Sequence, residues 1–173
     1  MPALRAIHLN EYHSFMSNVD EDKSKRTTRT GSPGSPGPRG RARELLVQAL
    51  YQMQIASHDK RELLAQFRER PEYERVDQEF FDEALGAIVD ERAALEELAV
   101  QYLDRPLTQL DPVERGILML GFYELQSRIE IPYRVVINEA VNLTRRFGAV
   151  DGHKYVNAVL DRAAGQIRQG ETR

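Results

Sequence analysis

The chain has 173 residues, of which 41% are hydrophobic and 29% are charged, and it contains no cysteine. This length and composition fit one domain, or two small subdomains that share a core. No apolar run approaches the roughly 18 residues that a membrane-spanning helix needs. Without cysteine there are no disulfides and no thiolate metal sites. Because the first residues also lack a continuous apolar segment, we expect a cytoplasmic protein with no secretory signal.

Positive charge is concentrated near the start of the chain. Residues 23–43 contain seven Lys or Arg and no acidic residue, so the rest of the chain carries −10 to give the overall net charge of −3. A basic arm on an acidic body favours an anionic partner. Residues 1–37 are predicted to be a disordered tail, because the run GSPGSPGP resists helix and sheet alike. Translation is expected to start either at Met1, which makes the whole tail genuine, or at Met16, and the sequence favours neither.

Helical periodicity begins just after the tail. One apolar face repeats over three turns and consists of Ala42, Leu45, Leu46, Ala49, Leu50 and Met53. A short second helix is expected from Asp59, where Glu62 completes a capping box, to the residue before Pro71. Residues 77–103 are periodic again, but three charged residues at 90–92 interrupt the apolar face. This stretch is therefore one long helix or two shorter ones.

The strongest local signal is the segment LDPVERGILMLGFYEL. Asp111 suits an N-cap, Pro112 suits the first helical position, and Glu114 would complete a capping box. Residues 116–123 carry no charge, which predicts a helix buried on nearly all sides. Two amphipathic helices follow, the first ending at Gly148 as its C′ residue and the second starting after Asp151. With no alternating strand pattern, we predict an all-α protein of about six or seven helices.

The sequence offers little sign of catalysis. The four histidines are scattered, and no metalloprotease, phosphate-binding or nucleophile-elbow motif is present. His153 has no nucleophile near it in the sequence. The acidic residues between positions 79 and 91 are better explained as a solvated helix face than as a metal site. We therefore predict a protein that is not an enzyme, with no cofactor.

Arginines and aromatic residues suggest RNA binding instead. Arg39, Arg41 and Arg43 occupy the first turns of a helix, where the dipole disfavours cations by about 0.3–1 kcal/mol each, so a bound phosphate would explain their position. A frayed, solvated helix end explains them equally well. Single-stranded RNA stacks its bases on aromatic rings. The candidate rings, each of which alone is better explained as core filling, are Tyr51, Tyr102, Phe147 and Tyr155.

Three segments carry a family resemblance: RARELLVQALYQMQ, DPVERGILMLGFYEL and IPYRVVINEAVNLTRRFGAVDGHKYVNAVLD. Together, over about residues 39–167, they resemble the NusB family of bacterial transcription antitermination factors. The resemblance implies a helical RNA-binding domain at residues 38–170, made of two small packed bundles. It implies binding of single-stranded boxA RNA of ribosomal RNA operons together with the small-subunit ribosomal protein NusE. It also implies assembly with other Nus factors and elongating RNA polymerase.

The resemblance also assigns roles to individual residues. Those expected to contact RNA are Arg39, Arg41, Arg43, Tyr51, Tyr102, Phe147, Asp151, Lys154 and Tyr155. Asp151 would repel phosphate but accept a hydrogen bond from a base amino group, and so contribute selectivity. Glu114 would contact the ribosomal protein, in addition to its capping role. Gly40 interrupts a basic run that is often unbroken in the family, which removes one phosphate contact.

Two questions remain open from the sequence. The main alternative is a helical protein-interaction or substrate-binding module without RNA affinity of its own. A NusB-like module can precede the catalytic domain of an RNA methyltransferase, but we expect no such domain here because the sequence has no room for one. Neither the oligomeric state, monomer or homodimer, nor the bases that are read can be predicted.

Overall fold

The computed structural model describes residues 35–171, so nearly all of the predicted tail, Met16 included, lies outside the described residues. Within this range every regular element is helical, which confirms the all-α prediction. The α-helices are α2 (Pro38–Ile55), α3 (Lys60–Arg68), α4 (Gln78–Asp90), α5 (Arg92–Val100), α6 (Pro112–Ser127), α7 (Tyr133–Phe147) and α8 (Gly152–Ile167). Two short 3-10 helices, Pro71–Arg75 and Leu107–Gln109, lie in the connections.

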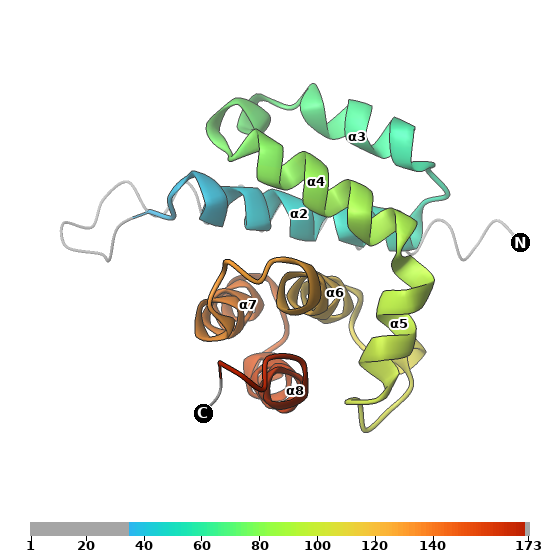
Figure 1. Ribbon diagram of the computed structural model, residues 1–173. Helices are drawn as coiled ribbons and strands as arrows, with labels where there is room; N and C mark the ends of the chain where they lie inside the picture. Colours follow the sequence, from blue (N-terminus) through green and yellow to red (C-terminus); the bar gives the residue numbers. More distant parts are fainter. Residues whose placement is uncertain (1–34, 172–173) are drawn as a thin grey trace, which may run out of the picture.

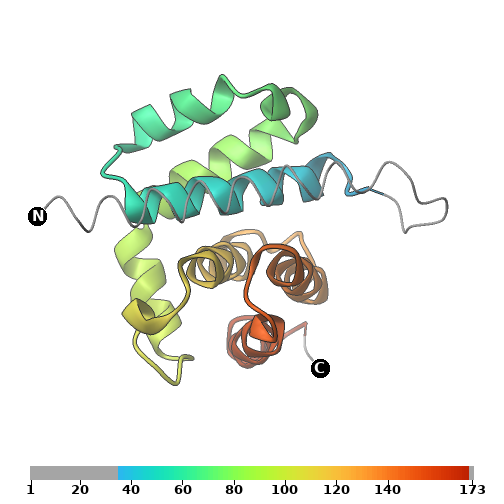
Figure 2. The ribbon, with the colours of Figure 1, turned by 180° about the vertical axis from the view of Figure 1, so that it is seen from behind.

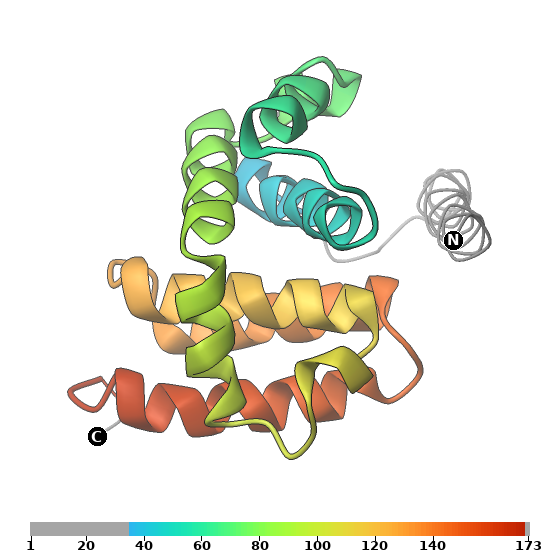
Figure 3. The same ribbon diagram turned by 90° about the vertical axis from the view of Figure 1, so that its right-hand side faces the viewer.

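The helices form two groups that meet along α2. Figure 1 shows α3 and α4 on one side of α2, and α6, α7 and α8 on the other. Helix α5 continues from the end of α4 and crosses the helices of the second group at a steep angle, where it contacts α6 (Figure 3). The arrangement matches the two packed bundles that the family resemblance implies.

Helix α2 is buried on two sides because it lies between these groups. It contacts α4 on one side and α6 on the other. Val47 and Tyr51, which lie outside the predicted apolar face, are therefore buried as well. The sequence pattern showed one core-facing stripe, whereas the fold covers most of the helix circumference.

Capping explains where several helices begin. The Asp59 side chain accepts from the Glu62 backbone N–H, and the Glu62 carboxylate accepts from the Asp59 N–H, so the predicted capping box is present. The Asp77 side chain caps α4 by accepting from the N–H of Phe80. Helix α4 ends and α5 begins at Glu91, so residues 77–103 form two helices and not one.

Helix α6 is the centre of the second group. Every residue from 116 to 125 is buried, as the uncharged segment predicts. Its glycines permit close approach of the neighbouring helices. A Cβ on Gly116 would lie 3.3 Å from the Leu50 Cβ of α2, and one on Gly121 would lie 2.8 Å from the Leu160 Cδ1 of α8. Larger residues here would push the helices apart.

The loop between α7 and α8 crosses the face seen from behind, below α2 (Figure 2). Gly148 ends α7 with φ −87°, an extended conformation rather than the left-handed C′ geometry that its position predicted. Glycine is still needed there, because a Cβ would lie 2.8 Å from the Thr144 carbonyl oxygen. The left-handed residue is Asp151, with φ 68°, which immediately precedes α8.

Candidate nucleic-acid interface

Arg39 and Arg41, at the start of α2, both contact the first helical group. The Arg39 guanidinium pairs with the Asp77 carboxylate at 2.9 Å and lies 4.9 Å from the centre of the Phe80 ring. Arg41 donates to the backbone carbonyls of Pro36 and Arg75. Its acceptors are thus uncharged, and Arg41 contributes a positive charge to the surface at this end of α2.

Arg43 points into the core. Its guanidinium donates through Nε and Nη2 to the Glu124 carboxylate of α6, with the shortest distance 2.6 Å. A second carboxylate, that of Glu139 on α7, lies 3.8 Å from Nη1. Only 4% of the Arg43 side chain is exposed. The predicted phosphate contact does not fit this position, because Arg43 joins α2 to the second helical group.

Two of the four candidate rings are also buried. Tyr51 is 4% exposed and Tyr102 is 9% exposed. The Tyr102 ring stacks on Phe122 with a centroid distance of 5.8 Å, and its hydroxyl donates to Gln166 Oε1. For Tyr51 and Tyr102 the core-filling alternative therefore describes the structure, and neither ring presents a face for a stacking base.

The other two rings, Phe147 and Tyr155, are half-buried and flank the α7–α8 loop. Each ring has a guanidinium beside its face. Arg146 lies 5.0 Å from the centre of the Phe147 ring, and Arg105 lies 4.6 Å from that of Tyr155. The combination of a flat ring and a cation suits a nucleotide, which offers a base and a phosphate together.

Arg105 was not predicted from the sequence, because it precedes its ring by fifty positions. It pairs with its neighbour Asp104, and the Tyr155 hydroxyl donates to the same carboxylate at 3.0 Å. Hydrogen bonds from Arg105 and Tyr155 lower the pKa of Asp104 to about 2. These contacts of Asp104 with Arg105 and Tyr155 hold the connection that follows α5 against the first turn of α8.

Asp151 and Lys154 occupy the exposed edge of the same region. Their side chains are 66% and 71% exposed and form an ion pair at 2.9 Å. Val150, beside them, is 94% exposed at the tip of the loop. We call the surface formed by Arg105, Phe147, Asp151, Lys154 and Tyr155 the loop surface.

Glu114 lies beneath the loop surface. Asp111 caps α6 by accepting from the N–H groups of Val113 and Glu114, as predicted. The Glu114 carboxylate does not complete the capping box. Burial raises the pKa of Glu114, and the nearby Asp111 carboxylate raises it further. The backbone N–H of Ala149 in the loop lies near the Glu114 carboxylate and counteracts part of this rise in its pKa. Glu114 is only 8% exposed, which leaves little of it for contact with a partner protein.

The predicted RNA-binding residues lie near both ends of α6. The guanidiniums of Arg39, Arg43 and Arg128 all lie near the Phe80 ring. Arg128 directly follows α6, so the start of α2 lies near the end of α6. The α7–α8 loop lies near the start of α6, at the other end of this helix (Figure 3). A helix of 16 residues is about 24 Å long at 1.5 Å per residue. Arg146 connects the two regions, because its guanidinium pairs with Glu44 of α2 and lies 5.0 Å from the centre of the Phe147 ring.

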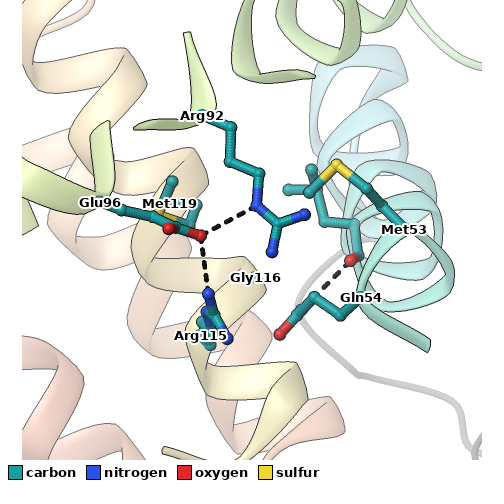
Figure 4. Close-up of a pocket in the computed structure, with 8 residues that line it drawn as sticks. Met53, Gln54, Arg92, Glu96, Arg115, Gly116 and Met119 are labelled. Carbon is teal, nitrogen blue, oxygen red and sulfur yellow. Dashed lines mark hydrogen bonds and ion pairs between the residues drawn. The ribbon is translucent and has the colours of Figure 1, made fainter. Parts of the chain in front are cut away.

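A small cavity lies between α2, α5 and α6 (Figure 4). Arg92 and Arg115 both donate to the Glu96 carboxylate at its wall, and Met53 and Met119 line it. The two arginines hold the pKa of Glu96 below its usual range. These ion pairs join α5 to α6, which is a structural role.

Two findings concern other classes of site. Among residues 35–171 no group of three or more His, Asp or Glu side chains is placed to hold a metal ion. No helix in this part of the chain has the length and hydropathy for crossing a membrane.

Comparison with known proteins identifies the fold. The family model described as "NusB family" matches residues 40–165. The chain belongs to the NusB family. Among curated members it is 45% identical to the Transcription antitermination protein NusB of Hahella chejuensis over 130 residues, which is 75% of this chain and 87% of that protein. It is likewise 45% identical to the protein of the same name from Burkholderia vietnamiensis, over 78% of this chain and 92% of the relative.

The solved structures agree. A structure of T. maritima NusB superimposes with a TM-score of 0.68 at 29% identity, covering 76% of this chain and 94% of that one. The chain therefore shares the fold of the T. maritima protein over nearly the whole of that protein's length.

Proposed function

We propose that this protein is a transcription antitermination factor that binds single-stranded boxA RNA of ribosomal RNA operons. In this proposal it binds together with the ribosomal protein NusE and joins other Nus factors and elongating RNA polymerase in the cytoplasm. The observation that carries it is the 45% identity over three quarters of the chain to relatives named as transcription antitermination proteins. The protein acts as an adaptor, without chemistry of its own.

The loop surface supports RNA as the ligand. Phe147 and Tyr155 give partly exposed aromatic rings, and Arg105 and Lys154 give exposed cations next to them. Bases stack on such rings while cations hold the phosphates. The exposed Asp151 carboxylate, which pairs with Lys154, is the acceptor for a base amino group, the role expected from the sequence.

The start of α2 contributes fewer groups. Arg41 is a surface cation whose acceptors are backbone carbonyls, so a phosphate can approach it without breaking an ion pair. The Arg39 side chain is 43% exposed and pairs with Asp77. Arg105 and Lys154 of the loop surface are likewise paired, each with an aspartate. Arg43, Tyr51 and Tyr102 are left out of the proposed interface because they are buried.

The proposal is tested by measuring the affinity for fluorescently labelled boxA-like RNA and for a scrambled strand, with and without purified NusE. If three or four phosphates are neutralised, log affinity falls with log salt concentration with a slope of about −2 to −3. Arg105→Ala and Lys154→Ala each weaken binding and make the slope shallower. Arg61→Ala, an exposed arginine of α3 on the far side of α2, is the matched control and leaves binding unchanged.

The same experiment identifies the alternative of a protein-interaction module. Equal and salt-independent affinity for both strands, with NusE present, would contradict RNA recognition and leave protein binding as the function. A Glu114 contact with NusE stays a prediction, and its burial means that NusE would have to reach the edge of this carboxylate beside the loop.

A further inference from the structure

We propose that Glu114 is a positioning residue that holds the α7–α8 loop in the conformation in which the loop surface is assembled. The loop carries Asp151 and connects Phe147 to Tyr155, so a change in its course moves each of these groups. As a statement about RNA affinity the inference rests on the proposed function. As a statement about the loop it stands on the structure alone.

The contact between Glu114 and Gly152 is the first step. A Cβ placed on Gly152 would lie 1.9 Å from Glu114 Oε1 and 2.8 Å from its carboxyl carbon. Real Cβ atoms do not approach another atom that closely, so any other residue at position 152 would displace the carboxylate. Glycine therefore admits Glu114 beneath the first turn of α8. Thr144, whose Cγ2 lies 3.3 Å from the same point, closes the site from α7.

The other end of the turn is the second step. The Ala149 backbone N–H lies near the Glu114 carboxylate and favours its charged form, which offsets part of the rise in the pKa of Glu114 that burial causes. Ala149 and Gly152 are the two ends of the turn, and the Gly152 N–H donates to the Ala149 carbonyl at 3.1 Å. One side chain of α6 thus meets both ends of the turn.

The turn contains a backbone conformation that contacts with Glu114 can stabilise. Asp151, inside the turn, has the left-handed φ of 68°. Its side chain makes no cap hydrogen bond to α8. Non-glycine residues adopt this region infrequently, Asn and Asp more readily than others, and they are held there by contacts with their surroundings. We infer that the contacts of Glu114 on either side impose it here.

The experiment is a double-mutant cycle on the full chain with Glu114→Ala, Gly152→Ala and the double variant. The readouts are amide hydrogen exchange of residues 149–154 without RNA, and affinity for boxA-like RNA. Each single variant should exchange about tenfold faster in the loop and bind RNA about tenfold more weakly. The double variant should be no worse than either single variant, because both remove the same contact.

Two further variants exclude a merely structural effect. Glu114→Gln retains a side-chain oxygen near the Ala149 N–H and should restore loop exchange to within about twofold of the wild type. Gly165→Ala, on the exposed side of α8 with open space around it, is the control for adding a methyl group. Exchange of the buried α6 amides should be unchanged in every variant, which shows that the fold persists.

The results separate the inference from the proposed function. Unchanged loop exchange in Glu114→Ala, or additive effects in the double variant, would overturn the positioning role. If the wild-type protein does not bind RNA, the exchange data still decide whether Glu114 holds the loop, and only the proposed function fails.

Discussion

The Arg43 guanidinium and the Glu124 carboxylate form a buried ion pair that joins the two helical groups. Arg43 Nη2 lies 2.6 Å from Glu124 Oε1, and the two side chains are 4% and 2% exposed. The guanidinium also lies 5.3 Å from the centre of the Phe80 ring. Burial raises the pKa of Glu124, while the hydrogen bond from Arg43 opposes that shift. Either charge would be costly to bury without the other, so the pair stays in the core only as a pair.

Breaking this pair should destabilise the fold. Arg43→Ala leaves a buried, unpaired carboxylate and should lower the free energy of unfolding by about 3–5 kcal/mol. The double variant Arg43→Met/Glu124→Leu removes both charges and should lose less, because no charge is left unpaired. Urea denaturation of the three proteins measures both quantities. A fully stable Arg43→Ala variant that has lost only RNA affinity would restore Arg43 as an RNA ligand.

The Arg43 position shows where sequence patterns reach their limit. Helical periodicity predicted the helices and the central place of α6, because local spacing determines which face of a helix is apolar. It left open whether residues 77–103 form one helix or two, and the structure has two. It did not predict that α2 is covered on two sides, since that depends on the tertiary packing of α4 and α6. Arg43 and Tyr51 were therefore assigned to the surface although both are buried.

The loop surface illustrates the same division. Phe147, Lys154 and Tyr155 lie within nine positions of one another. The family resemblance assigned all three to RNA contact. Arg105 joins them only through the fold, because its ring partner is fifty positions away. No periodicity or motif relates positions so far apart, and the contact is visible only in three dimensions.

The left-handed backbone at Asp151 predicts a specific order of stabilities. Glycine adopts this conformation without steric cost, whereas alanine does not. Asp151→Gly should change the free energy of unfolding by less than about 0.5 kcal/mol, and Asp151→Ala should lower it by about 1 kcal/mol. Thermal or urea denaturation measures the difference. Equal stability of the two variants would show that the position is not constrained to positive φ.

The raised pKa of Glu114 predicts a dependence of stability on pH. The folded state binds the Glu114 proton more tightly than the unfolded state does, so the stability it contributes is present below the ordinary carboxyl pKa of about 4.3 and is lost as pH rises through the folded value. Glu114→Gln does not titrate at this position. The stability of the wild type relative to Glu114→Gln should therefore fall as pH rises above the ordinary carboxyl pKa of about 4.3. Urea denaturation at pH values below and above this pKa tests the sign, which a lowered pKa would reverse.

The lowered pKa of Asp104 is measurable directly. Its carboxyl should titrate at about 2, because Arg105 and then Tyr155 stabilise the charged form. The contacts that depend on this charge are present above the ordinary aspartate pKa of about 3.9 and are lost as pH falls towards the folded value. Arg105→Ala should raise the pKa more than Tyr155→Phe does. An NMR titration of the side-chain carboxyl carbon follows each variant, and an unshifted pKa in the wild type would contradict the cluster.

Two glycines in helices should respond to alanine in opposite directions. Gly86 of α4 has no atom within 4 Å of the position that a Cβ would occupy, whereas at Gly121 of α6 the Leu160 side chain lies 2.8 Å away. Gly86→Ala should raise the free energy of unfolding by about 0.5–1 kcal/mol, since alanine loses less backbone entropy in a helix. Gly121→Ala gains the same entropy but forces α8 away from α6 or Leu160 out of its rotamer, at a cost of about 1–3 kcal/mol. Adding Leu160→Ala to Gly121→Ala should then lose less stability than the two separate losses combined, because the alanine methyl group fills part of the space that Leu160 leaves. Purely additive losses in urea denaturation would contradict the close approach of these two helices.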